Sequence, residues 1–520
     1  MSKKKLLLFN TDKARLFAFL FFLVTSAILF YLCKYLFFYD EDIFVVNPQG
    51  RFMSDFTRAS VIKLSFLADN FLSGANPLGY HITNILLHLC NTLLATYIFR
   101  LLLKFTVLEE SKARNAYYIF FFLFLLSPVH SEPLCYLLGR AGSVVTLFCL
   151  LSLLFFLKAN FKNTAFLIIS LTFFLLALFS YEISWTFPVI ILLIANYLKQ
   201  YRPLRGKTML IYVAPFFAVF LVWFLVKVAL LNQLKITPYG NDVFLLSDPL
   251  RLAKNMLALL FRNVLPPFEN TVIFVVLSVI TATILVYIFM ILKRKNIPLL
   301  FFALLIAVSC LLAYLPALVF GISSHNSESE RYIYFSSVFA IMFLALAISI
   351  LRNQQAKKFV VIACCCIYAY FLFATINKYI QGGKLSADYL RLVEKEQADY
   401  ENVYLLNQPS QYKGVLLFRA NSDQQNSSQK TTTTLQDFMY NLYKRNRSEY
   451  ITLSKKEIST DSAIKNLVRI SVDNLPFIFS GFYLNKEKNV LVNPSGDSTF
   501  FDSRNSIIVG LKQPTLYIFK

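Results

Sequence analysis

Three consecutive acidic residues, Asp40, Glu41 and Asp42, lie in the segment FFYDEDIFVV, directly after the first long apolar run of the chain. A carboxylate held at a membrane surface can act as a general base toward a substrate that is partly in lipid and partly in water. A solvated helix end that orients the preceding apolar segment would also explain these acids. The residue types alone leave both interpretations open.

A second group of polar residues lies in the apolar segment NPLGYHITNILLHLCN. His81 and His88 are seven residues apart and therefore share one face of a helix with Asn84, and Asn91 follows about one turn later. Polar residues on one side of a membrane helix face the helix bundle and not the lipid. Hydrogen bonds between helices would explain His88 and Asn91 without any catalytic role.

Further ionisable residues lie where apolar runs end. The segment SPVHSEPLCYLLGRAGS contains His130, Glu132 and Arg140, and the segment SESERYIY contains Glu330 and Arg331. At these positions the charged groups need not cross the hydrocarbon. An interfacial Arg331 that pairs with Glu330 would be a purely structural explanation for that segment.

These residues are set in a strongly apolar chain. Of its 520 residues, 57% are hydrophobic and 54 are phenylalanine, which is far too apolar for a soluble globular protein. A membrane-spanning helix needs about 20 mostly apolar residues, and the sequence predicts an all-α polytopic membrane protein with about eleven of them. They fall near 15–38, 78–103, 115–129, 141–157, 163–180, 184–198, 208–230, 271–292, 298–320, 332–351 and 359–377. The first run is too long for a removable signal peptide.

The charges are distributed unevenly between the loops. The formal net charge is +22 at pH 7, and Lys and Arg cluster in alternate loops such as RPLRGK and KRK. Acidic residues gather in the other loops. This positive-inside pattern predicts a cytoplasmic N-terminus and places the acidic loops on the extracytoplasmic face. It explains the positive charge without a nucleic-acid partner.

The composition changes near residue 380, where the chain becomes rich in Asn, Ser, Gln and Thr. Short alternating runs such as SIIVGLKQPTLYIFK are typical of strands. We therefore expect a transmembrane domain over 1–380 and a small water-soluble α+β domain over 381–520. With an odd number of spans, this second domain would be extracytoplasmic.

The sequence contains no HExxH, CxxC, P-loop or dinucleotide-binding motif. We therefore predict no cofactor and no dedicated metal site. Asp40 and Asp42 could still contribute to a divalent-cation site assembled from several loops.

Five ordered segments resemble the GT-C glycosyltransferase superfamily. They are YDEDIFVVNP, NPLGYHITNILLHLCN, SPVHSEPLCYLLGRAGSVVTLFCLLSLLFFL, ALFSYEISWTFPVIILLIANY and SESERYIYFSSVFAIMFLALAIS. The most similar branch is that of bacterial relatives of the protein O-mannosyltransferases that carry tetratricopeptide repeats. The resemblance covers most of 35–350. The chain departs from that branch after residue 380, where the repeats are absent, at SPVH in place of HPVH, and at Tyr181 in place of Lys.

The resemblance implies a membrane glycosyltransferase that moves a sugar from a polyprenyl-phosphate donor to a protein, glycan or lipid acceptor on the extracytoplasmic face. It also implies an acidic base in the first outer loop, at Asp40 or Asp42. The base would take the proton of the acceptor hydroxyl while C1 of the sugar is attacked opposite the phosphate, so that the configuration inverts. Arg140 and Arg331 are the expected ligands of the donor phosphate, because a planar guanidinium can donate two parallel hydrogen bonds.

Five other residues are expected to bind substrate or to orient these groups. They are His81, His130, Glu132, Glu182 and Glu330. For Glu132 and Glu182 a structural role is an equal alternative.

Two other classes of function are compatible with parts of the sequence. A transporter or flippase of lipid-linked glycans would explain the many helices, but such proteins carry paired repeats or acids deep in the membrane, and the sequence has neither. A membrane scaffold or sensor would explain the C-terminal domain but not the charged clusters in alternate loops. We expect an integral protein of the bacterial cytoplasmic membrane that is surrounded by membrane lipids.

Overall fold

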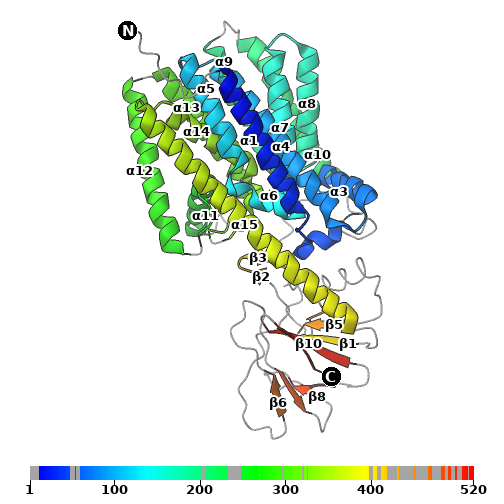
Figure 1. Cartoon of the computed structure of the whole chain (residues 1–520). Helices are drawn as coiled ribbons and strands as arrows, with labels where there is room; N and C mark the ends of the chain where they lie inside the picture. Colours follow the sequence, from blue (N-terminus) through cyan, green and yellow to red (C-terminus); the bar gives the residue numbers. More distant parts are fainter. Residues whose placement is uncertain are drawn as a thin grey trace. The chain divides into compact units, whose positions relative to one another are not determined.

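The computed structural model describes most of the chain before residue 397 and a set of strands after it (Figure 1). The described residues are 11–46, 53, 59–201, 206–231, 248–268, 270–295, 297–318, 321–324, 326–396, 402–406, 411–417, 430–431, 449–452, 467–470, 482–485, 490–492, 498–500, 506–512 and 515–519. The chain forms two compact units. The first comprises Met1–Lys34, Asp55–Ser65 and Gly79–Ile376, and the second comprises Tyr35–Ser54, Phe66–Leu78 and Asn377–Lys520.

The first unit is a bundle of α-helices. Its long helices are α1 (Thr11–Cys33), α4 (Pro77–Leu103), α5 (Glu110–Leu125), α7 (Arg140–Ala159), α8 (Thr164–Leu178), α9 (Phe187–Lys199), α10 (Gly206–Leu231), α11 (Pro249–Arg262), α12 (Thr271–Lys295), α13 (Ile297–Tyr314), α14 (Tyr334–Ser349) and the first part of α15 (Gln354–Glu396). Part of α3 (Ser60–Ser73) also belongs to it. Short helices follow the ends of several long ones: η2 (Pro128–His130), α6 (Ser131–Cys135), η3 (Leu137–Gly139), η4 (Glu182–Thr186), η7 (Leu315–Ala317) and η8 (Glu330–Tyr332). Candidate site residues lie on η2, α6, η4 and η8.

Eight helices of the described part are long and apolar enough to cross a membrane, or nine if α5 and the bent segment after it form one span. Each of the eleven predicted segments contains a helix, but the predicted count of eleven spans is not confirmed. α8 and α14 have only 15 and 16 residues. Helices of this length rise about 23 Å, whereas the hydrocarbon core of a bilayer is about 30 Å thick.

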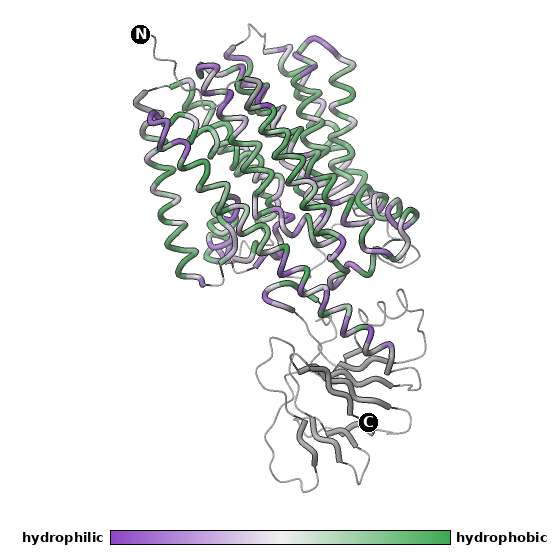
Figure 2. Tube along the Cα trace, viewed as in Figure 1, coloured by the Kyte–Doolittle hydropathy of each residue, from purple (hydrophilic) through white to green (hydrophobic). Residues whose placement is uncertain are grey.

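The helices differ in how much of their apolar surface is buried in the bundle. Every residue of α5 from Tyr118 to Leu125 is buried, as expected for a helix that is apolar on all sides, and α14 packs against it. By contrast, only 11% of the apolar stretch of α12 is buried. Figure 2 shows apolar residues along most of each helix in this unit and hydrophilic residues near the helix ends. The charged groups are therefore gathered at the ends of the bundle.

Small polar residues join neighbouring helices inside the bundle. The hydroxyl of Ser152 on α7 donates to the backbone oxygen of Ser170 on α8 over 2.8 Å, and the hydroxyl of Ser170 donates to the backbone oxygen of Ser152 over 2.6 Å. Such pairs let two backbones approach closely and satisfy both hydroxyls in an apolar setting.

The second unit contains the acidic segment as η1 (Asp40–Val45), the end of α15 and short strands. In one sheet, β1 (Asn402–Leu406) lies between β10 (Ser506–Lys512) and β5 (Glu449–Thr452), parallel to both, while β11 (Thr515–Phe519) and β4 (Lys430–Thr431) are antiparallel edges. A second sheet is an antiparallel meander of β6 (Leu467–Ile470), β7 (Phe482–Asn485), β8 (Val490–Val492) and β9 (Ser498–Phe500). A hairpin joins β2 (Gln411–Tyr412) and β3 (Val415–Leu416). The predicted α+β domain over 381–520 is not confirmed by these strands alone.

Candidate functional site

A buried ion pair connects α6 with η8 in the first unit. One carboxylate oxygen of Glu132 accepts from the guanidinium of Arg331 over 2.5 Å, and the other accepts from the backbone N–H of Arg331 over 2.7 Å. The side chain of Glu132 is 2% exposed and that of Arg331 is 19% exposed. A single carboxylate thus fixes both the backbone and the side chain of Arg331, while part of that side chain stays accessible.

A second ion pair supports the first. The guanidinium of Arg262, at the end of α11, donates to Glu330 over 2.6 Å, and neither side chain is exposed. The other carboxylate oxygen of Glu330 accepts from the hydroxyl of Ser131 over 2.7 Å and from the backbone N–H of Glu132 over 3.1 Å. Arg262, Glu330, Glu132 and Arg331 therefore form one connected chain of charges, which we call the Arg–Glu network.

The sequence does not predict this pairing. The expected alternative for Arg331 is a pair with Glu330, but Arg331 pairs with Glu132 and Glu330 pairs with Arg262. Arg262 was not among the candidate residues. Its place before NVLPP, where a helix must end, is a weak signal that cannot identify a partner 68 residues away.

Two glycines allow the segments of the network to approach closely. A Cβ added at Gly139 would lie 2.7 Å from the backbone oxygen of Glu132. A Cβ added at Gly142 would overlap the backbone oxygen of Arg331 and lie 3.0 Å from its Cα. Because these contacts involve backbone atoms, no side-chain rotation can relieve them. The segment LLGRAG is therefore explained by the close packing of η3 and α7 against the network.

Arg140 has a different environment from Arg331. It is fully buried, and it donates to the side-chain oxygen of Asn84 over 2.7 Å, to the hydroxyl of Ser65 over 3.2 Å and to the backbone oxygen of Tyr80 over 2.8 Å. These bonds join the start of α7 to α3 and α4. The role of Arg140 as a phosphate ligand stays a prediction.

The histidines lie inside the bundle. His88 bonds the hydroxyl of Tyr334 through Nδ1 over 2.8 Å and the backbone oxygen of Leu125 through Nε2 over 3.2 Å. His130 bonds the hydroxyl of Ser337 through Nε2 over 2.9 Å. The ring centres of His88 and His130 are 5.0 Å apart. This arrangement connects α4, η2 and α14. His81 is also fully buried, on α4. Substrate contacts of His81 and His130 remain predictions.

Two tyrosine rings lie near Arg331. The guanidinium of Arg331 lies 5.0 Å from the ring centre of Tyr332, and that ring stacks on Tyr181 with 5.9 Å between centres. Burial raises the pKa of Tyr181 above its usual range, so its hydroxyl stays protonated and can donate. Glu182 follows in η4 and is half-buried; its role in binding substrate is untested by this geometry.

A polar groove of about 650 Å³ begins next to the network. It lies between the start of α11 and the segment that leads into η8. Its cations are Arg251 and Lys254 and its acids are Asp248 and Glu328; the remaining lining residues are Leu250, Asn255, Gly321, Ile322, Ser323, Ser324 and Ser329. Ser329 directly precedes Glu330, and the backbone oxygen of Ser323 accepts from Arg262. The sequence did not single out Arg251 or Lys254.

The acidic segment is anchored within the second unit by Tyr39. Its hydroxyl donates to the backbone oxygen of Tyr379 on α15 over 2.7 Å, and the two rings meet edge to face. A Cβ added at Gly383 would lie 2.8 Å from the Tyr39 hydroxyl oxygen. The segment IQGGK thus leaves room on α15 for the acidic segment.

Asp40 and Asp42 are both buried, and both belong to the second unit. Asp40 has a φ of 46°, a left-handed conformation that costs energy for a residue with a side chain. Its backbone N–H donates to the backbone oxygen of Leu417 over 2.7 Å. One oxygen of Asp42 accepts from the backbone N–H of Tyr39 over 3.1 Å, so Asp42 stabilises the start of η1. In the described part of the chain, no group of three or more His, Cys, Asp or Glu side chains is placed to hold a metal.

We expect Gly142→Ala to destabilise the protein by about 1–3 kcal/mol, because the added methyl forces the backbone of Arg331 to move. The measurement is the midpoint of thermal unfolding of the purified protein. Gly206→Ala is the matched control, since a Cβ there meets no atom within 4 Å. Equal midpoints for the two variants would contradict the close packing described.

We expect Glu330 to make stability depend on pH. Burial raises its pKa from 4.5 to about 7, although Arg262 opposes the shift. The folded state therefore retains a proton that the unfolded state releases. Its stabilising effect is fully present below about pH 4.5 and is lost as the pH rises through about 7.

The unfolding midpoint of the wild type, relative to that of Glu330→Gln, should fall between about pH 5 and about pH 8. Glu109→Gln, at an exposed position, serves as the control, and its unfolding midpoint should depend on pH as that of the wild type does. Parallel pH curves for wild type and Glu330→Gln would show that Glu330 does not titrate in this window.

Comparison with known proteins gives limited sequence similarity. No family model matches the chain. The chain is 35% identical over 97 residues to protein O-mannosyl-transferase TMTC2 of Mus musculus, which covers 18% of this chain and 10% of the relative. It is 37% identical over 106 residues to protein O-mannosyl-transferase TMTC4 of Homo sapiens, covering 18% of this chain and 14% of the relative. The chain thus matches about a tenth of the length of these curated relatives.

Solved structures give only a loose likeness. The crystal structure of ArnT from Cupriavidus metallidurans bound to undecaprenyl phosphate has a TM-score of 0.44 and 10% identity, over 75% of this chain and 82% of that one. The oligosaccharyltransferase of Archaeoglobus fulgidus, tethered to an acceptor peptide, has a TM-score of 0.37 and 12% identity, over 78% of this chain and 63% of that one. Alignments at these TM-scores do not establish a shared fold. The resemblance to protein O-mannosyltransferases that the sequence segments indicate is confirmed as similarity to the curated relatives.

Proposed function

We propose that this protein is a membrane glycosyltransferase that moves a sugar from a polyprenyl-phosphate carrier to a hydroxyl acceptor on the extracytoplasmic face. The observation that carries the proposal is the partly exposed side chain of Arg331, which Glu132 holds two residues after Ser329, a lining residue of the polar groove. The similarity to protein O-mannosyl-transferases supports the class of reaction. The acceptor is a protein, a glycan or a lipid.

Arg331 is the best candidate for binding the donor phosphate. When the bond between C1 and the phosphate oxygen breaks, the phosphate gains negative charge, and a fixed cation lowers the energy of that state. Among Arg140, Arg262 and Arg331, only Arg331 is partly exposed, whereas the other two are fully buried. Because Glu132 holds the guanidinium in place, little reorganisation is needed when charge develops.

We assign the rest of a lipid-linked phosphate sugar to the groove, whose lining carries two cations and two acids. Arg251 and Lys254 lie on one side of it. Its hydroxyl and amide groups can bond sugar hydroxyls, which is the usual way that a polar pocket fixes the orientation of a sugar. We assign the donor headgroup to this groove. Glu330 orients Glu132 through its backbone N–H, and Arg262 pairs with Glu330.

Asp40 is the preferred base. Backbone strain that a structure retains is often found at functional residues, and Asp40 has the left-handed φ of 46°. Asp42 already uses one oxygen to bond the backbone of Tyr39. In the proposed step, Asp40 takes the proton of the acceptor hydroxyl, the acceptor oxygen bonds C1, and the polyprenyl phosphate leaves with the electron pair of the broken bond.

The base is tested by sugar transfer from a panel of labelled polyprenyl-phosphate sugars to mixed acceptors, with the full chain in nanodiscs. We expect Asp40→Asn to lower turnover by about 100-fold or more, as is usual when a general base is lost. Asp42→Ala should lower the unfolding midpoint as well as turnover, because it removes the oxygen that accepts from the backbone N–H of Tyr39. Asp388→Asn, an exposed carboxylate on α15, is the control.

Full turnover in folded Asp40→Asn would reject Asp40 as the base. An absence of donor binding and turnover across the panel would reject the glycosyltransferase proposal and favour a transporter or scaffold.

Arg331→Lys tests the phosphate role. Lysine keeps the charge but loses the planar pair of donors, so we expect turnover to fall by about tenfold or more while the protein still folds. The measured quantities are kcat and KM for the donor, and Arg352→Lys, on an exposed segment, is the matched control. Unchanged kcat and KM in Arg331→Lys would remove Arg331 from the donor site.

A further inference from the structure

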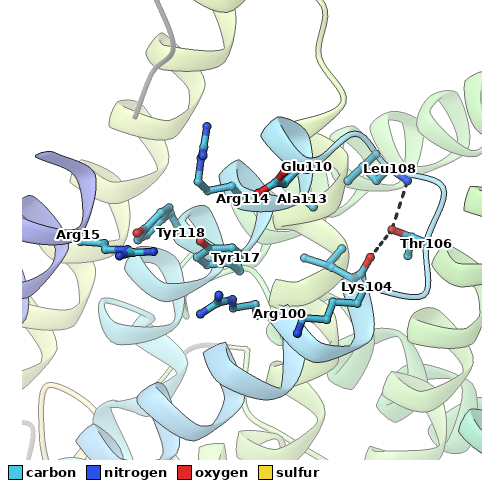
Figure 3. A pocket seen from close by; sticks show the side chains of 11 residues that line it. Arg15, Arg100, Lys104, Thr106, Leu108, Glu110, Ala113, Arg114, Tyr117 and Tyr118 are labelled. Atoms are coloured by element: carbon cyan, nitrogen blue, oxygen red, sulfur yellow. Dashed lines mark hydrogen bonds between the residues drawn. The ribbon is translucent and has the colours of Figure 1, made fainter. Parts of the chain in front are cut away.

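Another pocket of the first unit lies at the opposite end of α4 from the Arg–Glu network. Its volume is about 400 Å³, and it is formed by the start of α1, the end of α4 and the start of α5 (Figure 3). Arg100, which lines it, is about 24 Å along the helix axis from Asn84, the residue that bonds Arg140. This pocket is therefore separate from the proposed donor groove.

The pocket is strongly basic. Its lining contains four cations, Arg15, Arg100, Lys104 and Arg114, and a single carboxylate, Glu110. In the described part of the chain, none of the four cations forms an ion pair with a carboxylate. Like charges repel when they are brought together without a counter-ion, so the arrangement favours an anionic ligand.

Several hydrogen-bond donors line the pocket. Figure 3 shows Arg15, from α1, and Arg100, from α4, on two sides of Tyr117 and Tyr118 of α5. The guanidinium of Arg100 lies 5.8 Å from the ring centre of Tyr117. The Nε of Arg114 is a buried donor with no hydrogen-bond partner among the described residues. Guanidinium and phenol groups are well suited to phosphate oxygens.

The helices α1 and α4 carry exposed apolar side chains next to these cations. On α1, Phe19 and Leu23 are exposed and follow Arg15 at intervals of four residues, which places them on the same face. On α4, Leu93 and Tyr97 are exposed and precede Arg100 on one face. Arg15 and Arg100 are thus each at the end of an exposed apolar stripe that is about 10 Å long.

We propose that this pocket binds the phosphate headgroup of an anionic phospholipid, whose acyl chains lie along the exposed faces of α1 and α4. Cations alone at a helix end can reach the membrane surface without a specific partner. Here they line one hollow together with two tyrosines, and the Nε of Arg114 has no partner among the described residues. The apolar stripes match the chains of the same ligand. Basic pockets between membrane helices are suited to such headgroups. A soluble phosphate would use the hollow but not the stripes.

The test is lipid binding to the full chain, purified and delipidated in neutral detergent. Phosphatidylglycerol, phosphatidylcholine and inorganic phosphate are added separately. Bound lipid is counted by native mass spectrometry, and the unfolding midpoint is followed as each probe is titrated. We expect phosphatidylglycerol to bind and raise the midpoint, while the other two probes at equal concentration do neither.

The double variant Arg15→Gln with Arg100→Gln should weaken phosphatidylglycerol binding by about tenfold or more, because two charge-assisted contacts are lost. The matched control, Lys199→Gln with Arg352→Gln, removes the same charge from exposed positions outside the pocket and should bind as the wild type does. If the double variant does not fold, each single variant replaces it and should lose binding several-fold.

Equal loss of binding in the pocket variant and the control would overturn the site. Equal binding of phosphatidylcholine would overturn the role of the cations. Displacement of phosphatidylglycerol by inorganic phosphate at similar concentration would overturn the role of the acyl chains. None of these measurements depends on sugar transfer, so they stand or fall separately from the proposed activity.

Discussion

The cost of burying charge is the constraint on which the candidate site depends. Moving one ion into an apolar interior costs several kcal/mol even after relaxation, and removing one partner of a buried pair costs about 3–5 kcal/mol. Arg262 and Glu330 are both fully buried. Their positions are therefore determined together, and the close contacts of the neighbouring glycines follow from the need to bring three chain segments to one place.

The bonds to backbone N–H groups extend this constraint along the chain. Glu330 holds the backbone of Glu132, and Glu132 holds the backbone of Arg331. Each carboxylate thus fixes the segment that carries the next charge. A guanidinium placed in this way needs little movement to stabilise new negative charge, which is the property that a departing phosphate requires.

The acidic segment is held by a different kind of contact. Tyr39 fills the space left by Gly383 on α15, and its hydroxyl bonds a backbone oxygen of the same helix. The left-handed conformation of Asp40 follows directly after this anchor. A strained backbone can persist only where its surroundings fix it, and the aromatic contact of Tyr39 with Tyr379 provides that rigidity.

The sequence determined the class of protein and the approximate positions of its helices, because apolar runs and loop charges depend on composition and local order. It also identified Glu132, Glu330 and Arg331 as unusual, since charged residues at the ends of apolar runs stand out without any knowledge of the fold. The number of spans was harder to predict, because the apolar segments 163–180 and 332–351 form helices of only 15 and 16 residues, which are short for a bilayer.

Only the tertiary structure decided which charge pairs with which. The neighbours Glu330 and Arg331 turn to different partners, and Arg262 and Glu132 reach them from segments far away in the sequence. The groove beside the network and the basic pocket of α1, α4 and α5 arise in the same way, from helix ends that only packing brings together. The local sequence indicates which charged residues need an ion-pair partner. Which residue becomes that partner is determined by the close packing of distant backbones.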